Sequence, residues 1–271
     1  MGKAVLTITA MLGLALGVAE KTQAQSAAGP TFSPTGPSAE AYGAAKGYPV
    51  PPKGGPTLNV AQEFLVGLHS HYDQVRPVRN VPTSGPPSLL KRAAKPIAPI
   101  YAYDGRIKTI HDYLAEHPAT GLLIARDDTI LFEHYQYARS DRDRFASWSM
   151  AKTVLGMLVG IAVAEGAIAS IDDLAAKYVP ELQGSEFGST PIRALLQMSS
   201  GIAFLETYQP GDDSSKLVAG LFAPEGPIAA VRQFDTRVAP PGRRFNYSST
   251  DSEVLGLVLR RAVGMPLTEF F

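Results

Sequence analysis

The segment from residue 145 to residue 166, FASWSMAKTVLGMLVGIAVAEG, constrains this chain most, because it places Ser149 and Lys152 three residues apart at the start of an apolar run. Residues 148–165 are apolar almost all the way round, which predicts a helix buried inside a domain. Gly166 is a typical left-handed stop for that helix, and Ser147 is its expected N-cap. Residues three apart share a helical face, so the Ser149 hydroxyl and the Lys152 ammonium can touch.

A lysine beside a serine has one obvious chemical use. If burial disfavours the charged form of Lys152, its neutral amine can take the proton of Ser149 and make the hydroxyl a nucleophile. The helix N-terminus adds a positive field where an oxyanion would develop. The competing interpretation of Ser149 is a capping hydroxyl. A second Ser-x-x-Lys, from Ser88 to Lys91, lies in a proline-rich and basic segment without a long apolar helix, so the helical context favours Ser149.

Composition excludes several classes of function. The 271 residues are 45% hydrophobic and 18% charged, with 25 basic and 25 acidic side chains and a net charge of zero. Such a chain can bury one sizeable core, and its neutral balance argues against nucleic acid or an anionic membrane surface as the main partner. There is no cysteine, hence no disulfide and no thiolate metal site. The close histidine pair, His69 and His71, could ligate a metal on a strand, but the other histidines show no ligand spacing. We therefore expect neither a metal nor a cofactor.

Three sections of the chain differ in composition. Residues 1–24 have a positive start, a short apolar run and a small-residue exit, which predicts a secretory signal peptide and a secreted or periplasmic protein. An uncleaved membrane anchor is the alternative interpretation. Residues 25–57 are rich in Pro, Gly, Ala and Ser, which is typical of a flexible spacer. The folded domain is therefore expected to comprise residues 58–271.

Local signals within that domain predict an α+β arrangement. Two β-rich runs, residues 121–125 and 129–135, flank a short polar turn and predict a hairpin. Besides the Ser149 segment, the expected helices comprise residues 58–70, 107–116, 192–198 and 252–263. Because most helices follow the strand pair, the chain is expected to segregate its strands and helices.

Several cap patterns mark helix ends. Ser170 and Asp173 have the spacing of a capping box, Thr190-Pro191 predicts the start of the next helix, and Asp251 or Thr250 is the expected cap of the last one. Gly264 is its expected stop. Residues 203–239 lack clear periodicity and are rich in Gly, Pro and Asp, which favours a long surface excursion.

Five short motifs follow one another along the second half of the chain, and their order can be compared with known families. They are Ser149-Met150-Ala151-Lys152, the stretch LLQMSSG at residues 195–201, Pro241-Gly242 with Phe245, Tyr247-Ser248-Ser249 and Val254-Leu255-Gly256. In this order, residues 119–271 resemble the serine β-lactamase and penicillin-binding-protein superfamily. Within it they are most similar to the class C β-lactamase-related esterases and amidases, especially the 6-aminohexanoate-dimer hydrolases.

The resemblance implies a β-lactamase/transpeptidase-like fold, an antiparallel sheet with a helical domain. It also implies that Ser149 is the acylated nucleophile, Lys152 its base, and Tyr247 the partner that relays a proton to the leaving group. From the residues alone, Tyr247 lies in a loop ahead of a helix, where a half-buried packing role is the alternative.

The chain departs from the superfamily pattern in two places. Ser249 stands where the common Tyr-x-Asn motif has an amide, so we expect Ser249 to contact substrate and to favour esters and linear amides over β-lactams. The chain also stops at Phe271, before any Lys-Thr-Gly-like strand, so a C-terminally truncated domain is expected.

These observations together predict a secreted serine hydrolase that forms an acyl-enzyme on Ser149 from a small-molecule amide or ester. No Gly-x-Ser-x-Gly elbow is present and no histidine follows Ser149, which argues against other serine-hydrolase designs. The alternatives are a β-lactamase or D,D-peptidase, and a truncated, catalytically inactive binding protein.

Overall fold

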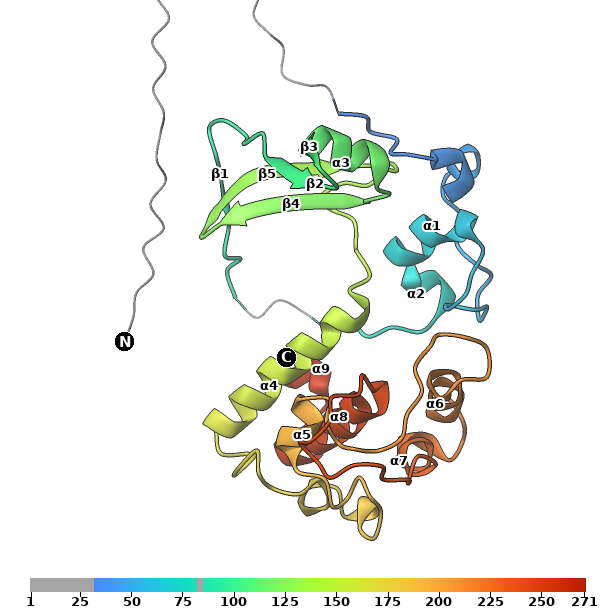
Figure 1. The fold of residues 1–271 in the computed structure, drawn as a ribbon, viewed down its shortest axis with the longest axis vertical. Helices are drawn as coiled ribbons and strands as arrows, with labels where there is room; N and C mark the ends of the chain where they lie inside the picture. Colours follow the sequence, from blue (N-terminus) through green and yellow to red (C-terminus); the bar gives the residue numbers. More distant parts are fainter. Residues whose placement is uncertain (1–31, 82–84) are drawn as a thin grey trace, which may run out of the picture.

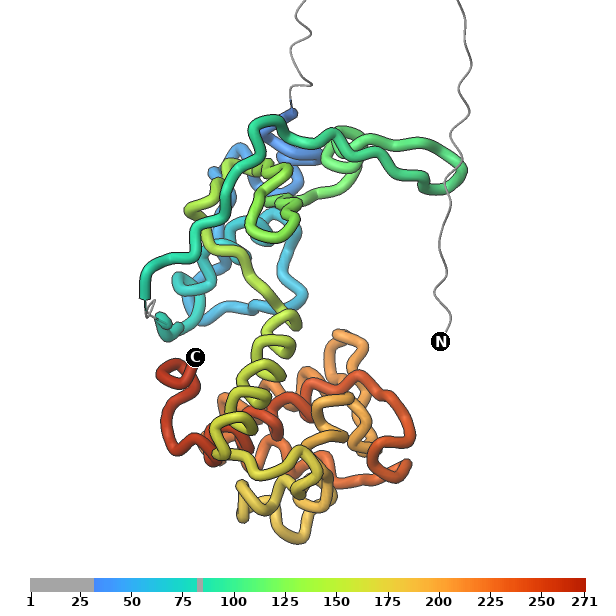
Figure 2. The backbone as a smooth tube through the Cα atoms, turned by 90° about the vertical axis from the view of Figure 1, so that its left-hand side faces the viewer, coloured from blue at the N-terminus to red at the C-terminus, as the bar shows by residue number. Residues whose placement is uncertain are grey.

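The computed structural model describes residues 32–81 and 85–271, and in this part of the chain all the strands lie at one end (Figure 1). The strands and the N-terminal helices form one end, and most of the later helices form the other. The helix that carries Lys152 runs between the two ends in both views (Figure 2). The expected signal peptide lies outside the described residues. No helix among the described residues is long and apolar enough to cross a membrane.

The predicted hairpin is present. β4 (Gly121–Arg126) pairs antiparallel with β5 (Thr129–Tyr135), and Gly121 lies opposite Tyr135. The register shifts by one residue between Ile124 and Ala125, which is a β-bulge. β1 (Lys91–Arg92) joins β5 in parallel, so the sheet order is β1-β5-β4. This order places the second Ser-x-x-Lys pattern at a sheet edge, where Lys91 pairs with Asp128 at 2.7 Å.

A second, two-stranded sheet precedes this hairpin. β2 (Ile100–Tyr103) and β3 (Arg106–Thr109) are antiparallel, and α3 (Ile110–Glu116) follows at once. The helix expected from residue 107 therefore begins three residues later. Thr109 explains the difference, because it forms a capping box with Asp112 and so ends the strand and starts the helix.

The expected flexible spacer is wrong for residues 32–57. Two 3-10 helices, Ala39–Tyr42 and Ala44–Lys46, form there, and the segment covers the fully buried Tyr137. The Tyr137 hydroxyl donates to the Pro37 carbonyl at 2.7 Å, and its ring meets the Tyr42 ring edge-on at 5.4 Å. Segments of low periodicity can still pack when aromatic anchors bury apolar area.

The helix expected at residues 58–70 is shorter than expected. A 3-10 turn (Gln62–Phe64) leads into α1 (Leu65–Ser70), and α2 (Tyr72–Val75) follows. Val66 and Leu68 of α1 are buried, and a side chain at Gly67 would collide with the Pro49 carbonyl. The residue-32–57 segment therefore packs directly against α1.

One continuous hydrophobic core lies among the helices of the second half of the chain. Its α-helices are α4 (Ala151–Ala164), α5 (Ile192–Leu196), α6 (Asp213–Leu221), α7 (Gly226–Arg232), α8 (Ser249–Val263) and α9 (Leu267–Phe270). Three 3-10 turns, Trp148–Met150, Ala175–Lys177 and Pro180–Leu182, connect them. The predicted α+β class is confirmed.

The prediction that residues 203–239 form a long surface excursion is wrong. That region contains α6 and α7, and it buries Phe204, Leu217 and Val231 in the core. α6 begins because the Asp212 carboxylate accepts the backbone N–H of Ser215 at 2.9 Å. Helices of seven to nine residues are too short to give a clear periodic pattern in a Gly- and Pro-rich sequence.

Helix α4 begins later than expected, and it is only partly buried. A 3-10 turn precedes it, Ser147 makes no capping bond with its side chain, and Gly166 adopts the expected left-handed conformation at φ 79°. Its buried residues are Leu158, Val159 and Ala162. Met157 is 65% exposed, so the prediction of a helix buried all round is wrong.

Two expected caps are also wrong. Ser248 caps α8 by accepting the Asp251 N–H at 3.3 Å, whereas Thr250 and Asp251 lie inside the first turn. The Thr190 hydroxyl donates to the Glu186 carbonyl at 2.8 Å and does not cap α5. By contrast, the expected stop of α8 at Gly264 is confirmed by its φ of 69°.

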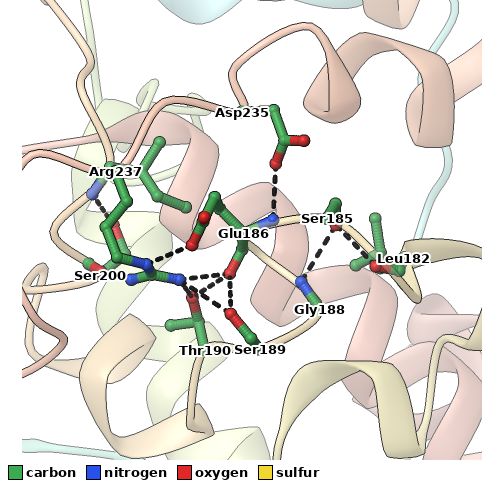
Figure 3. Close-up of polar contacts among 10 residues, drawn as sticks. Leu182, Ser185, Glu186, Gly188, Ser189, Thr190, Ser200, Asp235 and Arg237 are labelled. Atoms are coloured by element: carbon green, nitrogen blue, oxygen red, sulfur yellow. Dashed lines mark hydrogen bonds and ion pairs between the residues drawn. The ribbon is translucent and has the colours of Figure 1, made fainter.

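A polar cluster around Arg237 joins segments that lie far apart in the sequence (Figure 3). The Arg237 guanidinium pairs with the Glu186 carboxylate, and it donates to the Ser200 carbonyl at 2.5 Å and to the Thr190 hydroxyl at 3.1 Å. The cluster therefore fixes the segment around Ser200, which in turn contacts the first turn of α8 through Asp251.

Candidate active site

Ser149 is contacted by both of the groups that the sequence analysis associated with it. The Lys152 ammonium donates to the Ser149 hydroxyl at 3.0 Å, and the Tyr247 hydroxyl donates to the same oxygen at 2.7 Å. The Lys152 nitrogen lies 5.2 Å from the centre of the Tyr247 ring. Two polar groups, from segments that are distant in the sequence, therefore converge on one hydroxyl oxygen.

Local geometry explains the Ser149 to Lys152 contact. Ser149 lies in the 3-10 turn Trp148–Met150, and Lys152 lies in the first turn of α4. The three-residue spacing brings the two side chains to one face. Ser149 is exposed and Lys152 is half-buried, so the burial of Lys152 is weaker than the sequence suggested.

Tertiary contacts position Tyr247. The Asn246 N–H donates to the Met198 carbonyl at 2.8 Å, and the Asn246 side-chain amide donates to the Phe204 carbonyl at 3.1 Å. On the other side, Ser248 begins α8 as its cap. Tyr247 is thus held between a helix start and the loop that follows α5.

The Ser199-Ser200-Gly201 motif is hydrogen-bonded to the start of α8, the helix that follows Tyr247. Asp251, fully buried on α8, accepts the Ser200 hydroxyl at 2.8 Å and the Ser200 N–H at 3.3 Å. Burial raises the pKa of Asp251 to about 6, although these hydrogen bonds favour its charged form. The motif therefore anchors the α8 start that carries Tyr247.

A cavity of about 580 Å³ opens beside Ser149 and Lys152. Its lining mixes polar, aromatic and aliphatic side chains, which come from Leu58, Asn59, Trp148, Glu206, Tyr208, Ser214, Leu217, Val218, Leu221, Ser249 and Glu253. This mixture suits a small molecule with both apolar and polar groups. A larger hollow between Asp172 and Ser189 contains none of the three converging residues.

Ser249 lines this cavity, but its hydrogen bonds are already directed at a protein group. Its hydroxyl donates to one oxygen of the Glu206 carboxylate at 2.8 Å, and its backbone N–H donates to the other at 2.8 Å. The sequence analysis expected Ser249 to hold substrate. In this structure Ser249 instead orients Glu206 toward the cavity.

Sequence reasoning missed three cavity residues, namely Glu206, Tyr208 and Glu253. Partial burial is the main cause that raises the pKa of Tyr208, and a hydrogen bond with Glu206 is the second. Burial raises the pKa of Glu253, and the Lys152 charge partly opposes this shift. Glu253 follows Ser249 by four residues on α8, so helical spacing could have indicated it. No signal indicated Glu206 or Tyr208, because they lie in a segment without periodicity.

The histidine pair does not form a metal site on a strand. His69 lies in the last turn of α1, and its ring accepts the indole N–H of Trp148 at 3.3 Å. His71 contacts Arg139 at 3.2 Å. Within residues 32–81 and 85–271, no group of three or more His, Asp or Glu side chains could hold a metal ion.

Comparison with known proteins identifies the family. The β-lactamase family model matches residues 107–271, which is more than half of the chain and includes Ser149, Lys152 and Tyr247. The chain belongs to the β-lactamase family. The predicted superfamily and fold are therefore confirmed.

Two relatives show which members this β-lactamase-family chain resembles. It is 26% identical to the 6-aminohexanoate-dimer hydrolase of Paenarthrobacter ureafaciens over 232 residues, which cover 82% of this chain and 57% of that protein. A solved structure from Bacillus anthracis, assigned as a 6-aminohexanoate-dimer hydrolase, matches with a TM-score of 0.64 and 18% identity. That match covers 76% of this chain and 56% of the other, and it shows the fold. The chain thus spans about half the length of these relatives.

Proposed function

We propose that this β-lactamase-family hydrolase is a serine amidase or esterase that acts through an acyl-enzyme on Ser149. The observation that carries the proposal is the convergence of the Lys152 side-chain nitrogen and the Tyr247 hydroxyl on the Ser149 oxygen, at 3.0 and 2.7 Å. These are distances at which protons can be exchanged between groups. The likeness to 6-aminohexanoate-dimer hydrolases supports a linear amide as the substrate.

The proposed reaction has two halves. Neutral Lys152 accepts the Ser149 proton while the serine oxygen bonds to the substrate carbonyl carbon, and the bond to the amine or alcohol then breaks. Tyr247 passes its hydroxyl proton to the departing group and regains a proton from Lys152, which becomes neutral again. A water molecule next gives a proton to Lys152 as its oxygen bonds to the acyl carbon. The bond to Ser149 then breaks, the serine oxygen takes the proton back from Lys152, and the acid is released. The positive end of α4 favours the oxyanion formed in each half.

The substrate proposal also rests on Ser249 and the cavity. A serine there offers one donor, and this donor is directed at Glu206, so little remains to hold the side-chain amide of a β-lactam. Leu217, Val218 and Leu221 supply an aliphatic wall suited to a methylene chain. We further propose that residues 1–24 direct export, so the substrate would be met outside the cytoplasm.

Covalent labelling tests the nucleophile. The 271-residue chain is treated with a fluorophosphonate, and the adduct is mapped by mass spectrometry. We expect the label on Ser149 and none in Ser149→Ala. Ser147→Ala is the matched control, because Ser147 is an exposed serine two residues away that makes no side-chain capping bond, and this variant should label normally. Label on Ser147 or Ser88 contradicts the proposal.

A substrate panel tests the specificity. A short-chain nitrophenyl ester, a linear aminohexanoate dimer and a chromogenic cephalosporin are compared at equal concentrations. We expect the ester and the dimer to give the larger kcat/KM. A cephalosporin with the largest kcat/KM would favour a β-lactamase or D,D-peptidase, and labelling without turnover of any of the three would place the substrate outside this panel.

A further inference from the structure

The residue before the proposed nucleophile has a strained backbone. Trp148 adopts a φ of 45°, which is the left-handed region that favours glycine. An L-residue with a side chain is strained in this conformation, because Cβ comes too close to the following carbonyl oxygen. Such strain persists only where surrounding contacts hold it, and it is typical of functional sites. The left-handed turn sets the direction in which the chain enters the 3-10 turn that presents Ser149.

One residue of α1 contacts this turn at two points. The Trp148 indole N–H donates to His69 Nε2 at 3.3 Å, and the two rings meet edge-on at 5.6 Å with planes 85° apart. The Ala146 N–H donates to the His69 carbonyl at 2.8 Å. His69 therefore contacts the chain on both sides of Ser147, although it precedes Trp148 by 79 residues. It also lies outside the residues that the family model matches.

The contact requires His69 to be neutral. An indole nitrogen can only donate a hydrogen bond, so Nε2 must accept and cannot carry a proton. Protonation of the imidazole would replace this acceptor with a donor facing another donor. His69 is half-buried, and burial lowers its pKa from the ordinary value of 6.5. The bond is thus formed at neutral pH.

Charged groups lie on both sides of this pair of rings. On the His69 side, a hollow is lined by Asp73, Arg79 and Arg144, of which Asp73 and Arg144 pair at 3.3 Å. On the Trp148 side, the cavity holds Lys152, Glu206, Tyr208 and Glu253. The nearest other histidine, His71, faces Arg139. Burial, and not any one of these charges, is the cause of the His69 shift.

We propose that His69 is a positioning residue: its neutral imidazole holds Trp148 in the left-handed conformation that orients Ser149, and its protonation releases that turn. This inference rests on the proposed function, since the reactivity of Ser149 is one of its measures. It predicts that the reactivity of Ser149 toward a fluorophosphonate falls in acid as His69 gains its proton.

The composition of the chain supplies a direct probe. Trp148 is the only tryptophan in the sequence, so indole fluorescence comes from this residue alone, and comparison with a His69 variant isolates the contribution of the contact. A protonated imidazole next to an indole quenches its emission. We expect the emission of the 271-residue chain to titrate in acid, with a midpoint below the ordinary histidine pKa of 6.5. In His69→Gln the amide oxygen can accept the indole N–H but does not titrate, so emission should stay constant.

Labelling by a fluorophosphonate gives the second readout. At pH 7.5 we expect His69→Phe, which keeps a ring but has no acceptor, to label Ser149 at least tenfold more slowly. His69→Gln should label within about threefold of the unaltered chain, and it should lose the part of the decline in acid that coincides with the emission titration. His71→Gln is the matched control, and it should keep both the emission titration and the labelling rate. Circular dichroism confirms that each variant is folded.

The outcomes separate this inference from the proposed function. Emission that does not titrate, emission that still titrates in His69→Gln, or a folded His69→Phe that labels at the normal rate would each overturn the role of His69. If the unaltered chain does not label at all, the proposed function is contradicted. In that case the emission experiment still tests whether the imidazole holds Trp148. A titration that disappears in His69→Gln supports this contact, and an emission that does not titrate contradicts it.

Discussion

Helices α4 and α8 are of nearly equal length, with 14 and 15 residues, and both contribute to the candidate site, yet they are buried in opposite ways. α4 is the more apolar helix, but only Leu158, Val159 and Ala162 are buried. α8 carries charges at both ends, and nevertheless buries six residues, including Asp251. Hydrophobicity along a sequence therefore does not by itself decide burial, because burial depends on what packs against each face.

The difference matches what each helix contributes. The exposed start of α4 carries Lys152 in its first turn and Ser149 in the 3-10 turn just before it, where a substrate can reach them. α8 holds Tyr247 in place through the Ser248 cap and the Asp251 to Ser200 bonds. In our interpretation, α4 supplies the reactive groups and α8 supplies the stability that aligns them.

The largest expected effect concerns the reactive end of α4. Lys152→Arg keeps the positive charge, but a guanidinium cannot be deprotonated in practice, so it cannot serve as a base. We expect the rate of Ser149 labelling and of ester turnover to fall by roughly 10²-fold or more. Lys177→Arg, which alters an exposed lysine paired with Asp173, is the control and should stay within about twofold. Near-normal turnover by Lys152→Arg would make Lys152 a structural residue.

Stability is expected to separate the two helices. Leu259 on α8 is fully buried, so Leu259→Ala should lower the free energy of unfolding by about 2–5 kcal/mol. Met157 on α4 is 65% exposed, and Met157→Ala should change it by less than about 0.5 kcal/mol. Urea unfolding followed by circular dichroism measures both. Equal losses would break the comparison, since they would mean that the exposed face of α4 is covered in solution.

Asp251 should give α8 a distinct dependence on pH. Its pKa is about 6 in the folded protein and 3.8 when unfolded, so the folded state binds the proton more tightly. The stability that Asp251 contributes is therefore fully present below pH 3.8 and is lost as pH rises through about 6. The shift of about two pKa units corresponds to a change of at most about 3 kcal/mol.

The comparison of the unaltered chain with Asp251→Asn isolates this effect. The asparagine cannot titrate, so the difference in unfolding free energy between the two proteins should shift in favour of the variant between pH 4 and pH 7. Urea unfolding at four pH values in that range provides the measurement. A difference that is constant with pH would show that Asp251 has an ordinary pKa.

The smallest expected effect concerns Ser249, the first residue of α8. Ser249→Ala removes the hydroxyl that donates to Glu206, but the backbone N–H of the same residue still donates to that carboxylate. We expect a loss of about 1 kcal/mol in unfolding free energy, which is the usual value for one hydrogen bond. Ser252→Ala, three residues later in α8, is the control. A loss above about 3 kcal/mol would mean that Glu206 is anchored mainly by this hydroxyl.

Local features of this protein followed from the sequence alone. The Ser149 to Lys152 contact depends on a three-residue spacing at a helix start, and the β4-β5 hairpin depends on two β-rich runs around a short turn. The stop at Gly264 depends on one glycine with a positive φ. In each case the interacting residues are close in the chain, so the residues themselves contain the necessary information.

Features that join distant segments were decided by the tertiary structure. Tyr247 meets Ser149 across 98 residues, and from the residues alone it could equally have been a packing side chain. His69 meets Trp148 across 79 residues, and Glu206 meets Ser249 across 43. The packing of residues 32–57 on Tyr137 and the exposure of α4 have the same origin. Burial and long-range hydrogen bonds depend on which surfaces the fold brings together, and no local pattern records that.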